Sequence, residues 1–166
     1  MPRYNTIRLA VNGRPGVLVE YVCSTENIIP GMQLEILADG TVRPSTSDDP
    51  ETDTLNQTLI AIENIPLGGG VVDDISDLTG SYQAGDIVQC QYFGRGDKAW
   101  CWLAPNQTTV IGSPVTPTGA AQGVQYSGTL EAVAGTPVSL LSVVGYALEA
   151  ATTGPGEVKR VAITIK

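Results

Sequence analysis

The chain has 166 residues, 42% of them hydrophobic and 16% charged, which suits one domain with a substantial core. Its formal net charge of −8 argues against nucleic acid as a partner, because an acidic protein repels phosphate backbones. The absence of histidine removes the commonest acid–base residue and metal ligand. The sequence shows neither a signal peptide nor an apolar run long enough for a membrane span. We therefore expect a protein made in the cytoplasm with no membrane partner.

The 19 Gly and 11 Pro residues divide the chain into short segments, which favours strands over long helices. Residues 6–11 and 17–22 flank a turn rich in Gly and Pro and are predicted strands. Apolar residues occupy alternate positions in segment 33–38, and an Asp-Gly pair connects this segment to residues 41–43. This pattern is typical of a hairpin. Residues 58–65 form a further predicted strand.

The region 85–103 has the strongest hairpin pattern, because two alternating segments flank the Gly-Arg-Gly-Asp sequence. A symmetric hairpin would place Cys90 directly opposite Cys101, at a separation that approaches disulfide range. However, three cysteines without a signal peptide favour buried free thiols over a disulfide framework. The sequence Arg-Gly-Asp at 95–97 is interpreted as part of the turn and not as a receptor-binding motif.

The second half of the chain continues this pattern of short strands. Residues 105–128 are expected to be loops that join short strands, and further strands are predicted at 129–133, 138–149 and 158–165. Nine or ten short strands without a helical period indicate an all-β fold, either a small barrel or a sandwich. We expect a single β domain over residues 1–166, with residues 1–14 as a possible N-terminal arm.

Several motifs resemble those of the small capsid decoration (cement) proteins of tailed bacteriophages. The motifs span nearly the whole chain and are Pro30-Gly31, Asp-Gly-Thr-Val at 39–42, and residues 82–88, 145–149 and 160–165. The resemblance implies a small β-barrel of tulip or jelly-roll type with an extended N-terminal segment and long loops. It also implies a homo-oligomer, often a trimer, on the outer capsid surface of the virion. The partners would be the major capsid protein and other copies of the chain.

Two sets of residues are candidate contacts for such partners. Arg3, Arg8 and Arg14 are concentrated near the start of an acidic chain, which suggests an arm that pairs with an acidic surface; alternatively, residues 6–11 add a strand to a neighbouring chain. The second set is the polar face of the predicted hairpin, comprising Gln89, Gln91, Phe93, Lys98, Trp100 and Trp102. Tryptophan is enriched at interface centres, although packing within the same chain is the competing interpretation.

The sequence offers little for catalysis or metal binding. Asp73, Asp74 and Asp77, or the acidic residues within 45–53, could hold a hard cation, but solvated turns explain them as well. No nucleophile has a histidine base, and the Gly-Gly-Gly run lacks the lysine of a phosphate loop. We therefore expect no catalytic activity, metal or cofactor. The alternatives are a carbohydrate- or surface-binding β-module, whose tryptophans stack on sugars, and a trimeric hydrolase similar to dUTPases.

Overall fold

The structure is a computed structural model that describes residues 8–9, 17–25, 27–45, 58–62, 81–118, 128–133 and 143–166. All regular secondary structure in these ranges is β-strand, which confirms the all-β prediction. No helix in the described ranges is suited to crossing a membrane. The strands are β1 (Arg8–Leu9), β2 (Val17–Val22), β3 (Leu34–Ile36), β4 (Val42–Pro44), β5 (Thr58–Ala61), β6 (Ile87–Phe93), β7 (Lys98–Leu103), β8 (Thr108–Thr109), β9 (Pro114–Pro117), β10 (Leu130–Ala132), β11 (Gly145–Ala147), β12 (Ala151–Thr152) and β13 (Lys159–Ile165).

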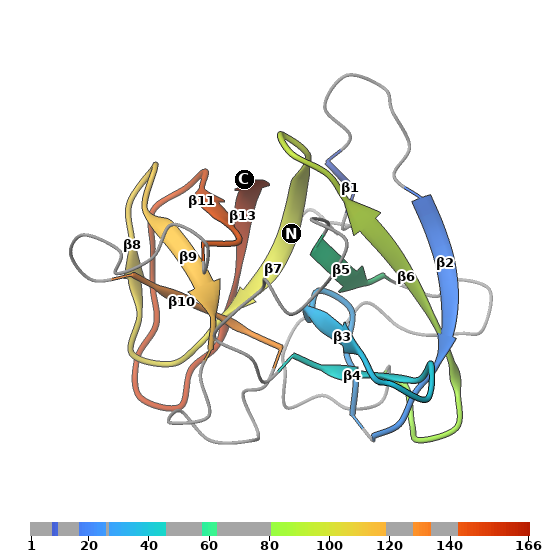
Figure 1. Cartoon of the computed structure of the whole chain (residues 1–166). Helices are drawn as coiled ribbons and strands as arrows, with labels where there is room; N and C mark the ends of the chain where they lie inside the picture. The colour runs from blue at the N-terminus through green and yellow to red at the C-terminus, as the bar shows by residue number, and fades with distance from the viewer. Residues whose placement is uncertain are drawn as a thin grey trace.

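Five of these strands close into a small barrel. They follow the order β7, β10, β9, β11 and β13, and β13 pairs back onto β7, on the left of the molecule in Figure 1. β13 runs antiparallel to β7 through six residue pairs. The opposite edge of β7 meets β1 at Lys98 and Ala99, and β10 at Leu103. The predicted small barrel is confirmed, and its tulip or jelly-roll type stays a prediction.

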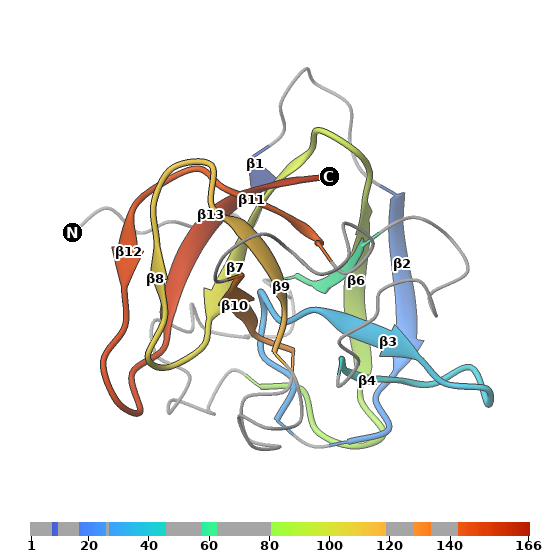
Figure 2. The same ribbon diagram turned by 60° about the vertical axis from the view of Figure 1, so that its left-hand side comes forward.

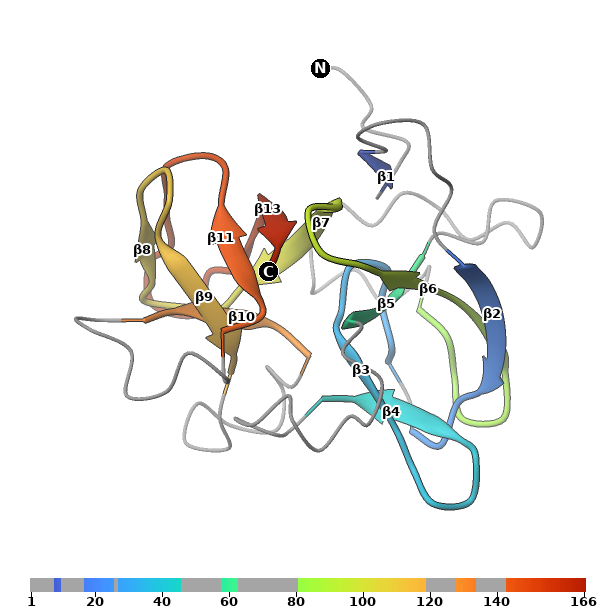
Figure 3. The same ribbon diagram turned by 45° about the horizontal axis from the view of Figure 1, so that its top comes forward.

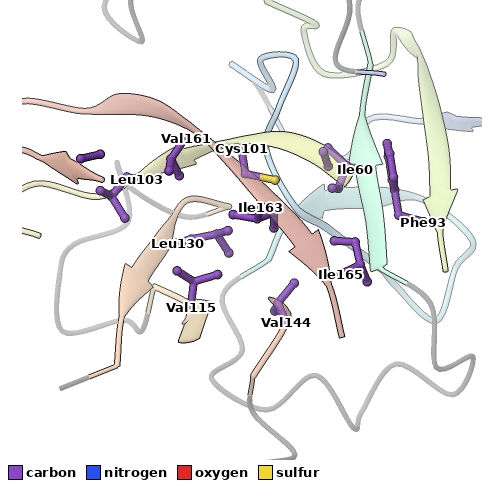
Figure 4. Packing of buried hydrophobic residues seen from close by; sticks show 12 residues of the cluster. Ile60, Phe93, Cys101, Leu103, Val115, Leu130, Val144, Val161, Ile163 and Ile165 are labelled. Carbon is purple, nitrogen blue, oxygen red and sulfur yellow. The ribbon is translucent and has the colours of Figure 1, made fainter. Parts of the chain in front are cut away.

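Alternate residues of the barrel strands fill its interior, as expected for strands with one buried face. Figure 4 shows Ile163, Leu130, Val115 and Val144 close together, with Ile60 and Phe93 farther away beside β5 and β6. Gly145 of β11 lies so close to the backbone of Thr164 that a Cβ atom would collide with the Thr164 carbonyl oxygen. The barrel cluster comprises Ile60, Phe93, Ala99, Cys101, Leu103, Val115, Leu130, Val144, Ala151, Val161, Ile163 and Ile165.

A second apolar cluster lies beside the barrel. The antiparallel sheet β2–β6–β5 and the hairpin β3–β4 surround it, and Figures 2 and 3 show these strands grouped on the side opposite β8. β5 joins the two clusters, because Leu59 and Ala61 pack in the second cluster while Ile60 packs in the barrel. The second cluster comprises Cys23, Ile28, Ile29, Met32, Leu34, Val42, Leu59, Ala61, Tyr82, Val88, Cys90 and Trp102.

The hairpin predicted around Asp39-Gly40 is confirmed. β3 pairs with β4 in an antiparallel register that places Glu35 opposite Arg43, and these two side chains form an ion pair. The Asp39 carboxylate accepts hydrogen bonds from the backbone N–H and the hydroxyl of Thr41, which holds the pKa of Asp39 below its ordinary value. Gly40 has a φ of 82°, a conformation that glycine adopts without steric cost.

The hairpin predicted over 85–103 is wrong, although both of its strands exist. β6 pairs with β2 and β5, whereas β7 pairs with β13, β1 and β10. The turn between them hydrogen-bonds to β13 instead of closing a hairpin: Gly96 N–H donates to the Ile165 carbonyl at 2.9 Å, and Ile165 N–H donates to the Asp97 carbonyl at 2.8 Å. Alternation shows that a strand has two different faces, but it does not identify the neighbouring strand. β6 and β7 are consecutive in the chain but therefore belong to different sheets.

Candidate functional site

The six residues of the predicted polar face do not form one surface. Phe93 and Gln91 are 1% and 3% exposed, so neither can meet a partner in the folded chain. Gln89, Lys98 and Trp100 are half-buried. Phe93 packs in the barrel cluster. Its strand, β6, belongs to a different sheet from β7. The prediction failed because it assumed that β6 and β7 share one sheet and one solvent-exposed face.

Trp102 joins the barrel to the second cluster and is not a surface residue. Its side chain is 1% exposed, and its indole N–H donates to the Pro30 carbonyl at 2.8 Å. The Arg160 guanidinium lies 4.9 Å from the ring centroid, a cation–π contact. Gly31 has a φ of 95° and lies close to the Trp102 ring. A Cβ added to Gly31 would be 3.1 Å from the indole nitrogen. Packing within the same chain, the competing interpretation, is therefore correct for Trp102.

The three cysteines are free and buried, as predicted. Cys90 is opposite Val19 and Ala61 in its sheet, whereas Cys101 is opposite Val161, so the predicted opposition of the two cysteines is wrong for the same reason as the hairpin. Burial raises the pKa of Cys23 to about 11 and those of Cys90 and Cys101 to about 12. A thiol with such a pKa stays protonated at neutral pH, whereas nucleophilic and metal-binding cysteines act as thiolates.

The turn that contains Arg95, Gly96 and Asp97 is held from within the chain. The Asp97 carboxylate accepts the Gly94 N–H at 2.7 Å, and Asp97 N–H donates to the Gly94 carbonyl at 3.1 Å. Gly96 has a φ of 84°, which favours glycine. This agrees with a turn-forming role for the Arg-Gly-Asp sequence.

The fold brings basic residues from two distant segments, the β6–β7 region and the end of β13, to one end of the barrel. Arg95 is exposed in the β6–β7 turn, Lys98 begins β7, and Lys166 follows β13 and is exposed. In the β-ladder, Lys98 is opposite Thr164 on β13, and Arg8 of β1 is paired with the neighbouring Ala99. We call Arg95, Lys98 and Lys166 the basic end; the Asp97 carboxylate lies in the same turn, where it accepts the Gly94 N–H. Figure 1 shows the β6–β7 turn, β1 and the C-terminus at the same end of the molecule.

Acidic side chains occupy turns at the opposite ends of the same strands. β6 begins after Asp86 and runs to the turn with Arg95, while β13 begins after Glu157 and ends before Lys166. Asp86 accepts the Gln83 N–H and Glu157 accepts the Gly154 N–H, both at 2.7 Å, so each carboxylate is fixed in its turn. β6 and β13 therefore run from an acidic turn toward the basic end.

Sequence reasoning identified part of the basic end. Lys98 is a predicted contact residue, whereas Arg95 and Lys166 are not, because only the β7–β13 pairing brings them together. One edge of β1 pairs with β7 of the same chain, and β1 is the terminal strand of its sheet in the described structure, so strand addition of residues 6–11 to a neighbouring chain stays a prediction.

Other predicted sites lie outside the described residues. These include Arg3, Arg14, the acidic residues after position 45, Gly-Gly-Gly, and Asp73, Asp74 and Asp77. Within the described ranges, no group of three or more His, Cys, Asp and Glu side chains could hold a metal ion. Neither a family model nor a curated protein matches the chain.

Proposed function

We propose that the chain is a structural virion protein that binds the outside of a phage capsid as a homo-oligomer and stabilises the lattice. The observation that carries the proposal is the basic end of a molecule whose net charge is −8. A polarised molecule of this kind suits a cement protein, because its basic end faces an acidic protein surface while its acidic remainder faces solvent.

The stabilising effect follows from mass action. A protein that binds only the assembled lattice raises the lattice's apparent stability, and several contacts in one oligomer act together through effective concentration. The closed barrel supports this role, because a rigid docking end loses little conformational entropy on binding.

The carbohydrate-binding alternative loses its main support. It depended on two tryptophans on a polar surface, and Trp102 is 1% exposed with its indole N–H donated to Pro30. Stacking on a sugar requires an accessible ring face, and one side of this ring already carries Arg160.

Co-sedimentation with capsids of the encoding phage tests the proposal. We expect an oligomer of the purified chain to bind these capsids and to raise their unfolding temperature. Arg95→Glu combined with Lys98→Glu should weaken binding about tenfold, since exposed ion pairs contribute about 0.2–1 kcal/mol each. Lys159→Glu, compared with Arg95→Glu alone, is the control for one reversed charge, because Lys159 is exposed at the other end of β13. A monomer that leaves capsids unbound, or equal weakening by Lys159→Glu, would refute the proposal.

A further inference from the structure

Exposed apolar side chains gather on one part of the β2–β6 sheet. Leu18 and Val22 of β2 are 50% and 45% exposed, and Ile87 of β6 is 54% exposed. Val22 is directly opposite Ile87, and Glu20 is directly opposite Gln89, so all five residues share a sheet face. We call these five residues the β2 patch. The other exposed large hydrophobic residues of the described chain, Val110 and Ile111, lie in the β8–β9 turn.

β2 is an edge strand in the described part of the structure. All six of its residues pair with β6, and no described strand pairs with its other edge. Figures 1, 2 and 3 all show β2 at the outer side of its sheet. A long edge strand presents backbone donors and acceptors to an incoming strand. An added strand would place alternate side chains beside Leu18, Glu20 and Val22.

The charge of Glu20 determines which strand fits. Two copies of β2 could pair antiparallel with Leu18 opposite Val22 of the other copy, but this register places Glu20 directly opposite the second Glu20. Like charges directly opposite each other destabilise a strand pair. Gln89 already approaches Glu20 from β6, its amide nitrogen lying 3.5 Å from the carboxylate, and it adds no positive charge. The register that would cover the apolar residues of both copies is therefore disfavoured.

We propose that the edge of β2 binds an extended segment of a partner protein in which Lys or Arg is flanked two residues away on each side by apolar residues. The basic side chain pairs with Glu20, and the flanking side chains cover Leu18 and Val22 together with Ile87. Backbone hydrogen bonds supply affinity, and the alternating side chains supply specificity. The inference does not depend on the proposed capsid role, because it follows from the patch and the strand edge alone.

Backbone NMR titration of the full chain with synthetic peptides tests the inference. The probes are acetyl-Thr-Val-Thr-Lys-Thr-Val-Thr-amide and the same peptide with Glu in place of Lys. We expect saturable shifts over β2 and about tenfold tighter binding of the Lys peptide, because the central cross-strand pair changes from attractive to repulsive. Glu20→Lys should invert this preference. No capsid is present, so a failure here leaves the capsid experiment unaffected.

A matched pair of variants distinguishes binding at the β2 patch from nonspecific hydrophobic binding. Leu18→Ser should weaken Lys-peptide binding at least fivefold, whereas Ile111→Ser, at the 75% exposed residue of the β8–β9 turn, should leave it unchanged. Four results would overturn the inference: no shifts over β2, equal affinity for both peptides, equal weakening by the two Ser variants, or sedimentation of a dimer that Leu18→Ser dissociates. The last result would identify a second copy as the occupant.

Discussion

The buried thiols predict a loss of stability at alkaline pH. Burial raises the pKa values of Cys90 and Cys101 from an ordinary 9.0 to about 12. The unfolded chain therefore releases these protons near pH 9, while the folded chain keeps them. Their contribution to stability is fully present below pH 9 and is lost as the pH rises toward 12. At pH 10 the two thiols together lower the free energy of unfolding by roughly 3 kcal/mol.

Urea unfolding with a reductant at constant ionic strength, at pH 7.5 and pH 10, measures this loss. The control is the double variant Cys90→Ala/Cys101→Ala, which starts less stable because of the cavities but should lose about 3 kcal/mol less between the two pH values. Cys23 and Tyr82, whose pKa values are raised to about 11 and about 12, shift stability in the same direction in both proteins. An equal pH-dependent loss in wild type and variant would refute the reasoning.

Two substitutions test the packing that joins the fold. Gly145→Ala should destabilise the chain by about 3 kcal/mol or more, since the new Cβ collides with the Thr164 carbonyl oxygen; a midpoint in urea close to wild type would show that the barrel relaxes easily. Trp102→Phe should cost about 2–4 kcal/mol, because it removes the hydrogen bond to Pro30 and leaves a cavity between the two clusters. Thermal unfolding measures that loss, and an unchanged midpoint would contradict the joining role of Trp102.

Local patterns predicted those elements whose partners are close in sequence or whose alternation is regular. The Asp39-Gly40 turn fixes β3 against β4 within a few residues, so the sequence contains all that the hairpin needs. β13 was predicted from the alternation of Val161, Ile163 and Ile165, which all face the barrel. Each prediction needs only one local feature, which is the turn for the β3–β4 hairpin and the buried face for β13.

The pairing of strands that are distant in sequence could not be predicted, because the alternation of a strand does not identify its neighbouring strand. β7 pairs with residues about 60 positions later, and no local signal distinguishes that partner from β6. Trp102 has polar neighbours in the alternating pattern and therefore looked exposed, yet the second cluster covers the outer wall of the barrel at that point. The basic end was only partly visible for the same reason, since Arg95 and Lys166 meet through the β7–β13 ladder.

The position of β7 between β1 and β13 also determines when the protein can complete its fold during translation. β7 leaves the ribosome roughly 60 residues before the β13 residues that cover it, a delay of about 3–12 seconds at about 5–20 residues per second. During that interval Cys101 and Leu103 have no barrel interior to enter, so the nascent chain exposes an apolar strand with an open edge. A chaperone that binds the nascent chain should therefore raise the yield of soluble protein, because it covers this strand until β13 has been synthesised.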